Sequence, residues 1–211
     1  TAGRGIPRER LEEVAHHYLA LGGVSPINEQ NRSLLESLRA EFTKRGIKTP
    51  IYWGNRNSHP FLAEALEQIK ADGHRRVLSF VSSAYSSYSG CRQYRENLAQ
   101  ALIETNLQGI LTIDKVRQYF DHPGFIAPFA RGLTEVLETL KKDGTTASDT
   151  HIFFTTHSIP ISMAETSGPA NLRNAPNNGA YVAQHKAAIT SILASVATQC
   201  AGEVPQWSLV Y

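Results

Sequence analysis

The segment FFTTHSIP, residues 153–160, places an ionisable side chain directly after an apolar run. The polar neighbours Thr156 and Ser158 indicate that His157 leaves the core rather than entering it. An imidazole accepts protons near neutral pH, and its neutral form binds transition metals. His157 is therefore a candidate proton acceptor and metal ligand, although a histidine at a strand end can also be a hydrogen-bonded structural residue.

Three further loops contain side chains that a simple connection does not need. They are WGNRNSHP (53–60), SAYSSYSGC (83–91) and DKVRQYFDHP (114–123), and each follows a predicted strand. In open parallel sheets, ligands bind outside the carboxyl ends of the strands. Aromatic rings offer stacking surface, and hydroxyl and guanidinium groups bind polar edges. These loops predict a site for a large flat ligand.

The elements that position these loops alternate along the chain. Helical spacing and stop signals predict helices over 8–21, 29–45, 60–71, 91–105, 124–142 and 179–198. Strand-forming residues predict strands over 50–54, 76–83, 109–113, 150–155 and 206–211. This order is typical of α/β proteins in which helices flank a parallel sheet. The polar stretch 141–149 is the best linker candidate, so we predict one domain over 1–145 and an incomplete second domain over 146–211.

Composition excludes several classes of protein. The chain of 211 residues is 41% hydrophobic and 19% charged, with a formal net charge of +2. It has no basic stripe for nucleic acid and no apolar run of the roughly 18–20 residues that a membrane span needs. Its two cysteines, Cys91 and Cys200, form no disulfide framework, so a cytoplasmic location is expected. The GxxxxGK[ST], GxGxxG, GxSxG, HExxH and paired CxxC signatures are absent at the positions where they would indicate function.

Five motifs in order resemble one enzyme family. They are GGVSPIN (22–28), YWGNRNSHPF (52–61), SAYSSYSGCRQY (83–94), YFDHPGF (119–125) and THSIP (156–160). Together they resemble the ferrochelatases, specifically the actinobacterial type that inserts iron into coproporphyrin. The resemblance implies two Rossmann-like, chelatase-type domains. It also implies a cytoplasmic, monomeric lyase of haem biosynthesis that inserts Fe²⁺ into a porphyrin, coproporphyrin III in this group.

The resemblance also implies roles for individual residues. His157 corresponds to the family's metal ligand and proton acceptor, and Ser25, Tyr94 and Arg56 correspond to residues at the porphyrin. Arg4 lies in a basic stretch that approaches a propionate in relatives. Each porphyrin-binding residue has an ordinary alternative: Ser25 as a turn residue, Tyr94 as a core residue and Arg56 as a surface cation.

The resemblance also implies an iron–sulfur cluster and a catalytic glutamate, for which residues 1–211 do not supply all the side chains. Many actinobacterial members hold a [2Fe–2S] cluster through one cysteine in this region and three near the C-terminus, which makes Cys91 a candidate ligand. A cluster needs four ligands, and Cys91 is otherwise a small, partly buried residue at a helix start. The family also uses a glutamate beyond the segment that ends at Tyr211, so we expect an isolated chain of residues 1–211 to be inactive.

Three other functions remain open at this point. One is a chelatase for another metal and tetrapyrrole, such as cobalt and an earlier macrocycle. Another is a non-catalytic carrier of porphyrin or haem, which would not need a base at His157. The third, a sugar- or nucleotide-binding domain, is disfavoured because the phosphate-binding motifs are absent. Composition does not distinguish coproporphyrin from protoporphyrin.

Overall fold

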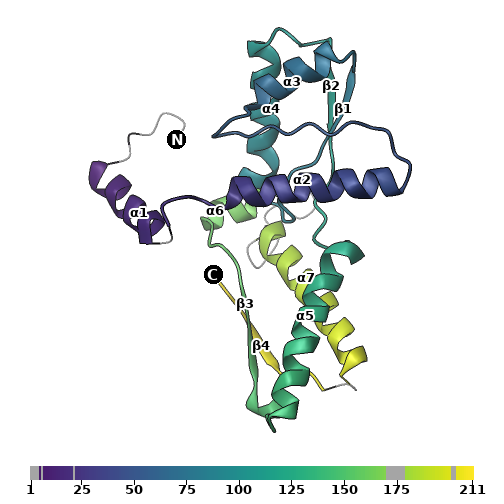
Figure 1. Cartoon of the computed structure of the whole chain (residues 1–211). Helices are drawn as coiled ribbons and strands as arrows, with labels where there is room; N and C mark the ends of the chain where they lie inside the picture. Colours follow the sequence, from purple (N-terminus) through teal and green to yellow (C-terminus); the bar gives the residue numbers. More distant parts are fainter. Residues whose placement is uncertain (1–4, 6, 21, 170–178, 201–202) are drawn as a thin grey trace. The chain divides into compact units, whose positions relative to one another are not determined.

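The computed structural model describes residues 5, 7–20, 22–169, 179–200 and 203–211. The chain divides into two compact units, residues 1–55 and residues 56–211, and each unit is described by itself. Figure 1 shows the helices and strands of both units. The domain boundary expected at residues 145/146 stays a prediction.

The first unit contains two helices, α1 (Arg8–Ala20) and α2 (Ile27–Lys44). Gly22 and Gly23 follow α1 with φ angles of +94° and +78°, which residues with a Cβ rarely adopt. The amide of Gly23 donates to the carbonyl of Tyr18 at 2.7 Å and so ends the helix. Both helices confirm the predicted ones, with boundaries shifted by one or two residues.

The strand predicted over residues 50–54 is wrong, because this segment has no strand structure. Its main chain bonds to a side chain instead of a neighbouring strand: Nη2 of Arg39 donates to the carbonyl of Ile51 at 3.1 Å. The guanidinium of Arg32 lies 5.5 Å from the ring centre of Trp53. Helix α2 therefore holds this extended segment through two arginine side chains.

The first part of the second unit contains a parallel strand pair. Strand β1 (Arg76–Ser79) pairs with β2 (Thr112–Lys115), with Arg76 opposite Thr112. Parallel strands need a long crossover connection, and here it contains α4 (Gln93–Glu104). Helix α3 (Leu62–Ala71) packs against α4.

Several boundaries in this part differ from the sequence prediction, and the strand expected over 76–83 ends already at Ser79. The strand expected over 109–113 begins only at Thr112, because Leu107 accepts hydrogen bonds from the amides of Ile110 and Leu111 in a turn. The helix expected over 91–105 begins earlier, as a π-helical turn over Tyr88–Arg92 that continues into α4. A π-turn inserts an extra residue into the helix, and its residue spacing escapes a search for a 3.6-residue period.

The remainder of the second unit repeats the pattern of a strand pair and helices. Strand β3 (His151–Thr155) pairs in parallel with β4 (Gln206–Val210), and α7 (Gly179–Gln199) lies between them in the sequence. A short helix that the sequence analysis missed, α6 (Ile161–Glu165), follows β3 directly. Helix α5 (Pro123–Lys142) precedes the pair, with a 3₁₀ turn over Ala147–Asp149 between α5 and β3.

Helices α5 and α7 lie side by side along the β3–β4 pair (Figure 1). Their contact is apolar, and removal of such surface from water stabilises the unit by roughly 25 cal/mol per Å². The buried cluster consists of Ile126, Ala130, Ala188, Ile192 and Val196. This packing sets the position of α7, on which the site described below depends.

The first turn of α7 approaches α6 closely at Gly179. This residue has a φ of +69°, and a Cβ there would lie 2.4 Å from the carbonyl oxygen of Ala164. Only glycine fits both the backbone conformation and the space. The contact places the start of α7 against the segment that follows β3.

The structure confirms a mixed α/β chain with small parallel sheets flanked by helices. In the described residues, the four strands form two separate two-stranded sheets. Among the described helices, none has both the length and the apolar character that crossing a bilayer requires.

Candidate active site

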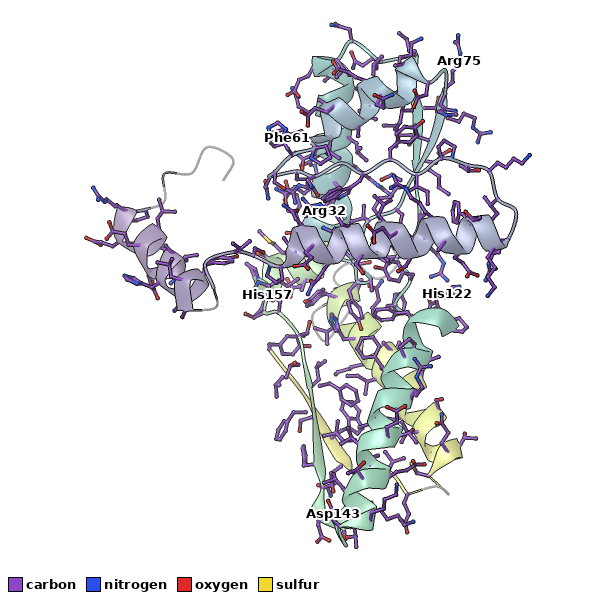
Figure 2. All side chains as sticks on the ribbon, in the orientation of Figure 1. Arg32, Phe61, Arg75, His122, Asp143 and His157 are labelled. Atoms are coloured by element: carbon purple, nitrogen blue, oxygen red, sulfur yellow. The ribbon has the colours of Figure 1, made fainter. Side chains whose placement is uncertain are left out.

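His157 lies two residues beyond the end of β3 and is labelled in Figure 2. Its side chain is exposed, whereas Ile152 and Phe154 of the preceding strand are partly buried. The polar segment after β3 thus turns out of the sheet before α6 begins. The location predicted for His157, an accessible imidazole at the carboxyl end of a parallel strand, is confirmed.

The main chain around His157 is held from two sides. The amide of Thr156 donates to the carbonyl of Val210 at 3.0 Å and extends the β3–β4 pairing by one bond. One residue further, the carbonyl of His157 accepts a hydrogen bond of 2.8 Å from the hydroxyl of Tyr181 on α7. The imidazole is therefore mounted on a backbone that both the sheet and the helix hold.

One face of α7 presents three polar side chains to these loops. Tyr181, Gln184 and His185 have the i, i+3, i+4 spacing of one helix face, and they are 7%, 5% and 5% exposed. Gln184 forms two hydrogen bonds with Ser86 in the loop after β1: it accepts from the amide at 2.7 Å and donates to the hydroxyl at 2.9 Å. The hydroxyl of Thr156 lies 2.9 Å from Nε2 of His185.

The sequence analysis missed this polar face of α7. The signal was present, since Gln184 and His185 interrupt the otherwise apolar stretch that follows Gly179. Buried polar side chains are costly unless they are hydrogen-bonded, so polar residues on the buried face of a helix indicate specific partners. Burial lowers the pKa of His185, with a smaller opposing contribution from the carbonyl of Tyr181.

Tyr85, one of the aromatic residues of the predicted ligand loops, packs within the protein. The ring of Tyr85 stacks on the imidazole of His185 at 3.6 Å between centres and 14° between planes. It also meets Phe120 and Phe125, and burial raises the pKa of its phenol. Tyr85 is thus engaged inside the protein and is not a free surface for a flat ligand.

The structure brings Arg56 and Tyr94 together. The Arg56 guanidinium lies 4.9 Å from the centre of the Tyr94 ring, and its Nε donates to Oδ1 of Asn97 at 2.7 Å. Both Arg56 and Tyr94 are partly buried. Tyr88 and Arg92 lie on the π-turn, and Glu96 lies on α4. The Tyr88 hydroxyl and Nε of Arg92 both donate to the Glu96 carboxylate, each at 2.8 Å.

Ser25 and Arg4 belong to the unit of residues 1–55. Ser25 is partly buried two residues before the start of α2, and its hydroxyl lies 3.5 Å from the amide of Ile27, the outer limit of a hydrogen bond. This position is compatible with the turn role considered from the sequence. Arg4 lies outside the described residues.

Cys91 lies on the π-turn before α4, and its Sγ accepts a hydrogen bond of 2.8 Å from Nε2 of Gln118. Burial lowers the pKa of the neighbouring Lys115, and the Cys91 sulfur acts in the opposite direction. Cys200 packs against the α5–α7 core instead.

These residues do not by themselves fit an iron–sulfur cluster. In the part of the chain that the structure describes, no three His, Cys, Asp or Glu side chains are close enough together to hold a metal ion. A cluster would need four ligands.

A pocket of about 950 Å³ lies at the other end of the α5–α7 pair. Its lining includes Leu137, Leu140, Cys200 and Pro205, and none of the predicted site residues. The chemistry expected from His157 therefore belongs to the exposed strand end and not to this pocket.

Comparisons with known proteins extend over nearly the whole chain. The ferrochelatase family profile matches residues 2–211. The coproporphyrin III ferrochelatase of Streptomyces griseus is 49% identical over 213 residues, covering 100% of this chain and 56% of the relative. The coproporphyrin III ferrochelatase of Leifsonia xyli is also 49% identical, over 100% of this chain and 55% of its own length. A ferrochelatase of Rhodopirellula baltica is 51% identical over 77% of this chain and 45% of its own length.

The chain belongs to the ferrochelatase family. It spans about half the length of the curated relatives that it matches. Membership of the family agrees with the exposed imidazole at the end of a parallel strand and with the chelatase-type fold that the five motifs implied.

Proposed function

We propose that this protein inserts Fe²⁺ into coproporphyrin III, with His157 as metal ligand and proton acceptor. The observation that most supports this proposal is the exposed imidazole of His157 on a main chain bonded to both β4 and α7. The names of the Streptomyces and Leifsonia relatives support the choice of metal and macrocycle.

The proposed reaction explains why a histidine is needed. Two pyrrole N–H groups of the porphyrin lose their protons while Fe²⁺ sheds water and forms bonds to the ring nitrogens. The two protons released balance the two positive charges that enter. A neutral imidazole can hold the arriving metal or accept one of these protons, and the other proton passes to solvent water.

The remaining predicted residues would bind the macrocycle. Arg56 and Tyr94 form one mixed cationic and aromatic surface, which suits a propionate beside a flat ring. Ser25 and Arg4 are proposed to contact the porphyrin on the basis of the family motifs. Cys91 as a cluster ligand is proposed on the same basis.

The wider setting also belongs to the proposal. We propose that the two strand pairs are parts of two Rossmann-like domains with a boundary near residues 145/146. We further propose that the protein acts in the cytoplasm as a monomer in haem biosynthesis.

An insertion assay with two porphyrins and two metals tests the proposal. Coproporphyrin III and protoporphyrin IX are supplied in parallel to the full-length protein, each with Fe²⁺ or Co²⁺, and the metalloporphyrin is followed by its absorption. The fastest turnover is expected for coproporphyrin III with Fe²⁺. A preference for Co²⁺ would favour a chelatase for another metal, and tight porphyrin binding with no turnover would favour a carrier.

A further inference from the structure

Four short polar contacts connect α7 to the main chain of His157. Nδ1 of His185 lies 2.7 Å from the carbonyl of Tyr181, and Nε2 of His185 lies 2.9 Å from the hydroxyl of Thr156. The hydroxyl of Tyr181 lies 3.1 Å from that of Thr156 and 2.8 Å from the carbonyl of His157. All these groups belong to the unit of residues 56–211.

The chemistry of the partners determines where the hydrogens lie at one end of this chain of contacts. A carbonyl oxygen only accepts, so Nδ1 of His185 must carry the hydrogen that points to Tyr181. In the neutral imidazole, Nε2 is then an acceptor, and the hydroxyl of Thr156 donates its one hydrogen to it. The backbone of α7 thereby selects one tautomer of His185.

The other end follows from the same rule. The carbonyl of His157 only accepts, so Tyr181 must donate its one phenolic hydrogen to it. The hydrogen of Thr156 is committed to His185, which leaves the contact between the two hydroxyls without a hydrogen. That contact, at 3.1 Å, is the longest of the four.

A second contact orients the imidazole so that Nε2 reaches Thr156. The Tyr85 ring stacks on it nearly face to face. The Tyr181 ring meets it edge-on, and the two ring centres are 4.5 Å apart. Gln184 fixes the loop that contains Tyr85 through its two bonds to Ser86, which is 1% exposed. Among the described residues, the ionisable groups with ring contacts to this imidazole are the two phenols.

We propose that His185 and Tyr181 are positioning residues for His157. His185 accepts the hydrogen of the Thr156 hydroxyl, so that hydroxyl does not donate to Tyr181. Tyr181 then donates to the His157 carbonyl and sets the direction in which the reactive imidazole leaves β3. This inference rests on the proposed function for its effect on turnover. The hydrogen positions that it specifies hold whether or not the protein inserts iron.

The kinetic test uses Tyr181→Phe, which keeps the ring and removes the hydroxyl. Loss of one hydrogen bond of average strength corresponds to up to about a tenfold change. We expect kcat for iron insertion to fall about tenfold, with KM for porphyrin within twofold of its original value. Thr156→Ser should retain turnover, since serine supplies the same donor. Thr190→Val is the matched control, because the Thr190 hydroxyl donates to the carbonyl of Lys186 within α7, on the exposed side of that helix. Unchanged kcat in Tyr181→Phe would overturn the proposal.

A spectroscopic test does not depend on activity. Nitrogen-15 NMR of the unmodified protein at neutral pH should show His185 as the Nδ1–H tautomer, the less common one in water. The carbonyl carbon of His157 should shift in Tyr181→Phe and stay unchanged in Thr190→Val. An Nε2–H tautomer at His185 would refute the proposal. This test uses the unmodified protein, so it remains valid if the Tyr181→Phe variant does not fold. Absence of iron insertion by the full-length protein, together with the expected tautomer, would reject the proposed function and leave the hydrogen-bond assignment intact.

Discussion

His157 and His185 lie at two neighbouring regions of the second unit and have opposite surroundings. The strand end exposes the imidazole of His157, and it fixes that residue through its main chain. The face of α7 buries the imidazole of His185, and it engages both ring nitrogens and one ring face. A reactive side chain must meet its substrate, so its precision has to come from neighbours that never touch that substrate. The exposed region contains the reactive side chain, and the buried region positions it. We therefore expect mutations at His157 to lower turnover and mutations on the buried face of α7 to lower stability.

The largest effect is expected for His157→Ala. Removal of a proton acceptor that is also a metal ligand should lower kcat for iron insertion by about 10²–10⁴-fold. The exposed side chain contributes little packing, so the melting temperature should stay within about 1–2 °C. Stopped-flow absorption and thermal unfolding measure the two quantities. His151→Ala, at the exposed start of the same strand, is the control and should keep kcat. Equal activity in both variants would remove His157 from the mechanism.

The second-largest effect is expected for Gln184→Leu, on the buried face of α7, and it concerns stability. This change leaves the buried amide of Ser86 without its acceptor, which costs about 1–3 kcal/mol of unfolding free energy. Urea unfolding should therefore show a lower midpoint than in the unmodified protein. Lys186→Leu, on the exposed side of the same helix, should leave the midpoint nearly unchanged. A stable Gln184→Leu variant would mean that α7 does not hold the loop after β1.

A third effect concerns pH. Burial lowers the pKa of His185 in the folded protein, whereas in the unfolded chain it should lie near the ordinary value of about 6.5. The unfolded chain then binds more protons between these two values, so the stabilising contribution is complete above about pH 6.5 and is lost as the pH falls through the folded-state pKa. Urea midpoints measured from pH 7.5 down to pH 5.5 should decline. His185→Gln should decline less over the same range, and an equal decline would assign the effect to other groups.

The smallest effect is expected at the surface of Arg56 and Tyr94. Arg56→Lys keeps the positive charge but loses the planar guanidinium that lies over the Tyr94 ring and bonds Asn97. We expect the porphyrin dissociation constant to rise about two- to fivefold, the equivalent of roughly 0.5–1 kcal/mol. Fluorescence quenching of the porphyrin measures this constant. Arg45→Lys, an exposed arginine paired with Glu41 at the end of α2, is the control. Unaltered affinity in Arg56→Lys would favour the surface-cation interpretation.

Local patterns were sufficient to predict most helices and the location of His157. The apolar run before Thr155 and the polar residues after it define the end of β3, and Gly22 with Gly23 defines the end of α1. Such signals depend on neighbouring residues alone, so a single sequence contains them. The prediction failed for residues 50–54, where the main chain bonds to a side chain of α2 instead of a strand.

Contacts between distant residues could not be predicted in this way. Tyr85 and His185 stack although 100 positions separate them, and the pattern around Tyr85 was equally compatible with a ligand-binding ring. The short helix α6 was missed because five residues after a proline show too little periodicity to recognise. The hydrogen-bond chain behind His157 combines β3 and α7, and neither segment alone indicates it.

The stack of Tyr85 on His185 has a practical consequence for experiments. Protons held above the face of a phenol ring experience its ring current, which moves their resonances upfield. Of the eight histidines in the chain, His185 stacks face to face on a phenol ring, so its imidazole signals should be shifted upfield. These shifted resonances report on the buried His185 imidazole, so its tautomer and protonation can be followed in the unmodified protein.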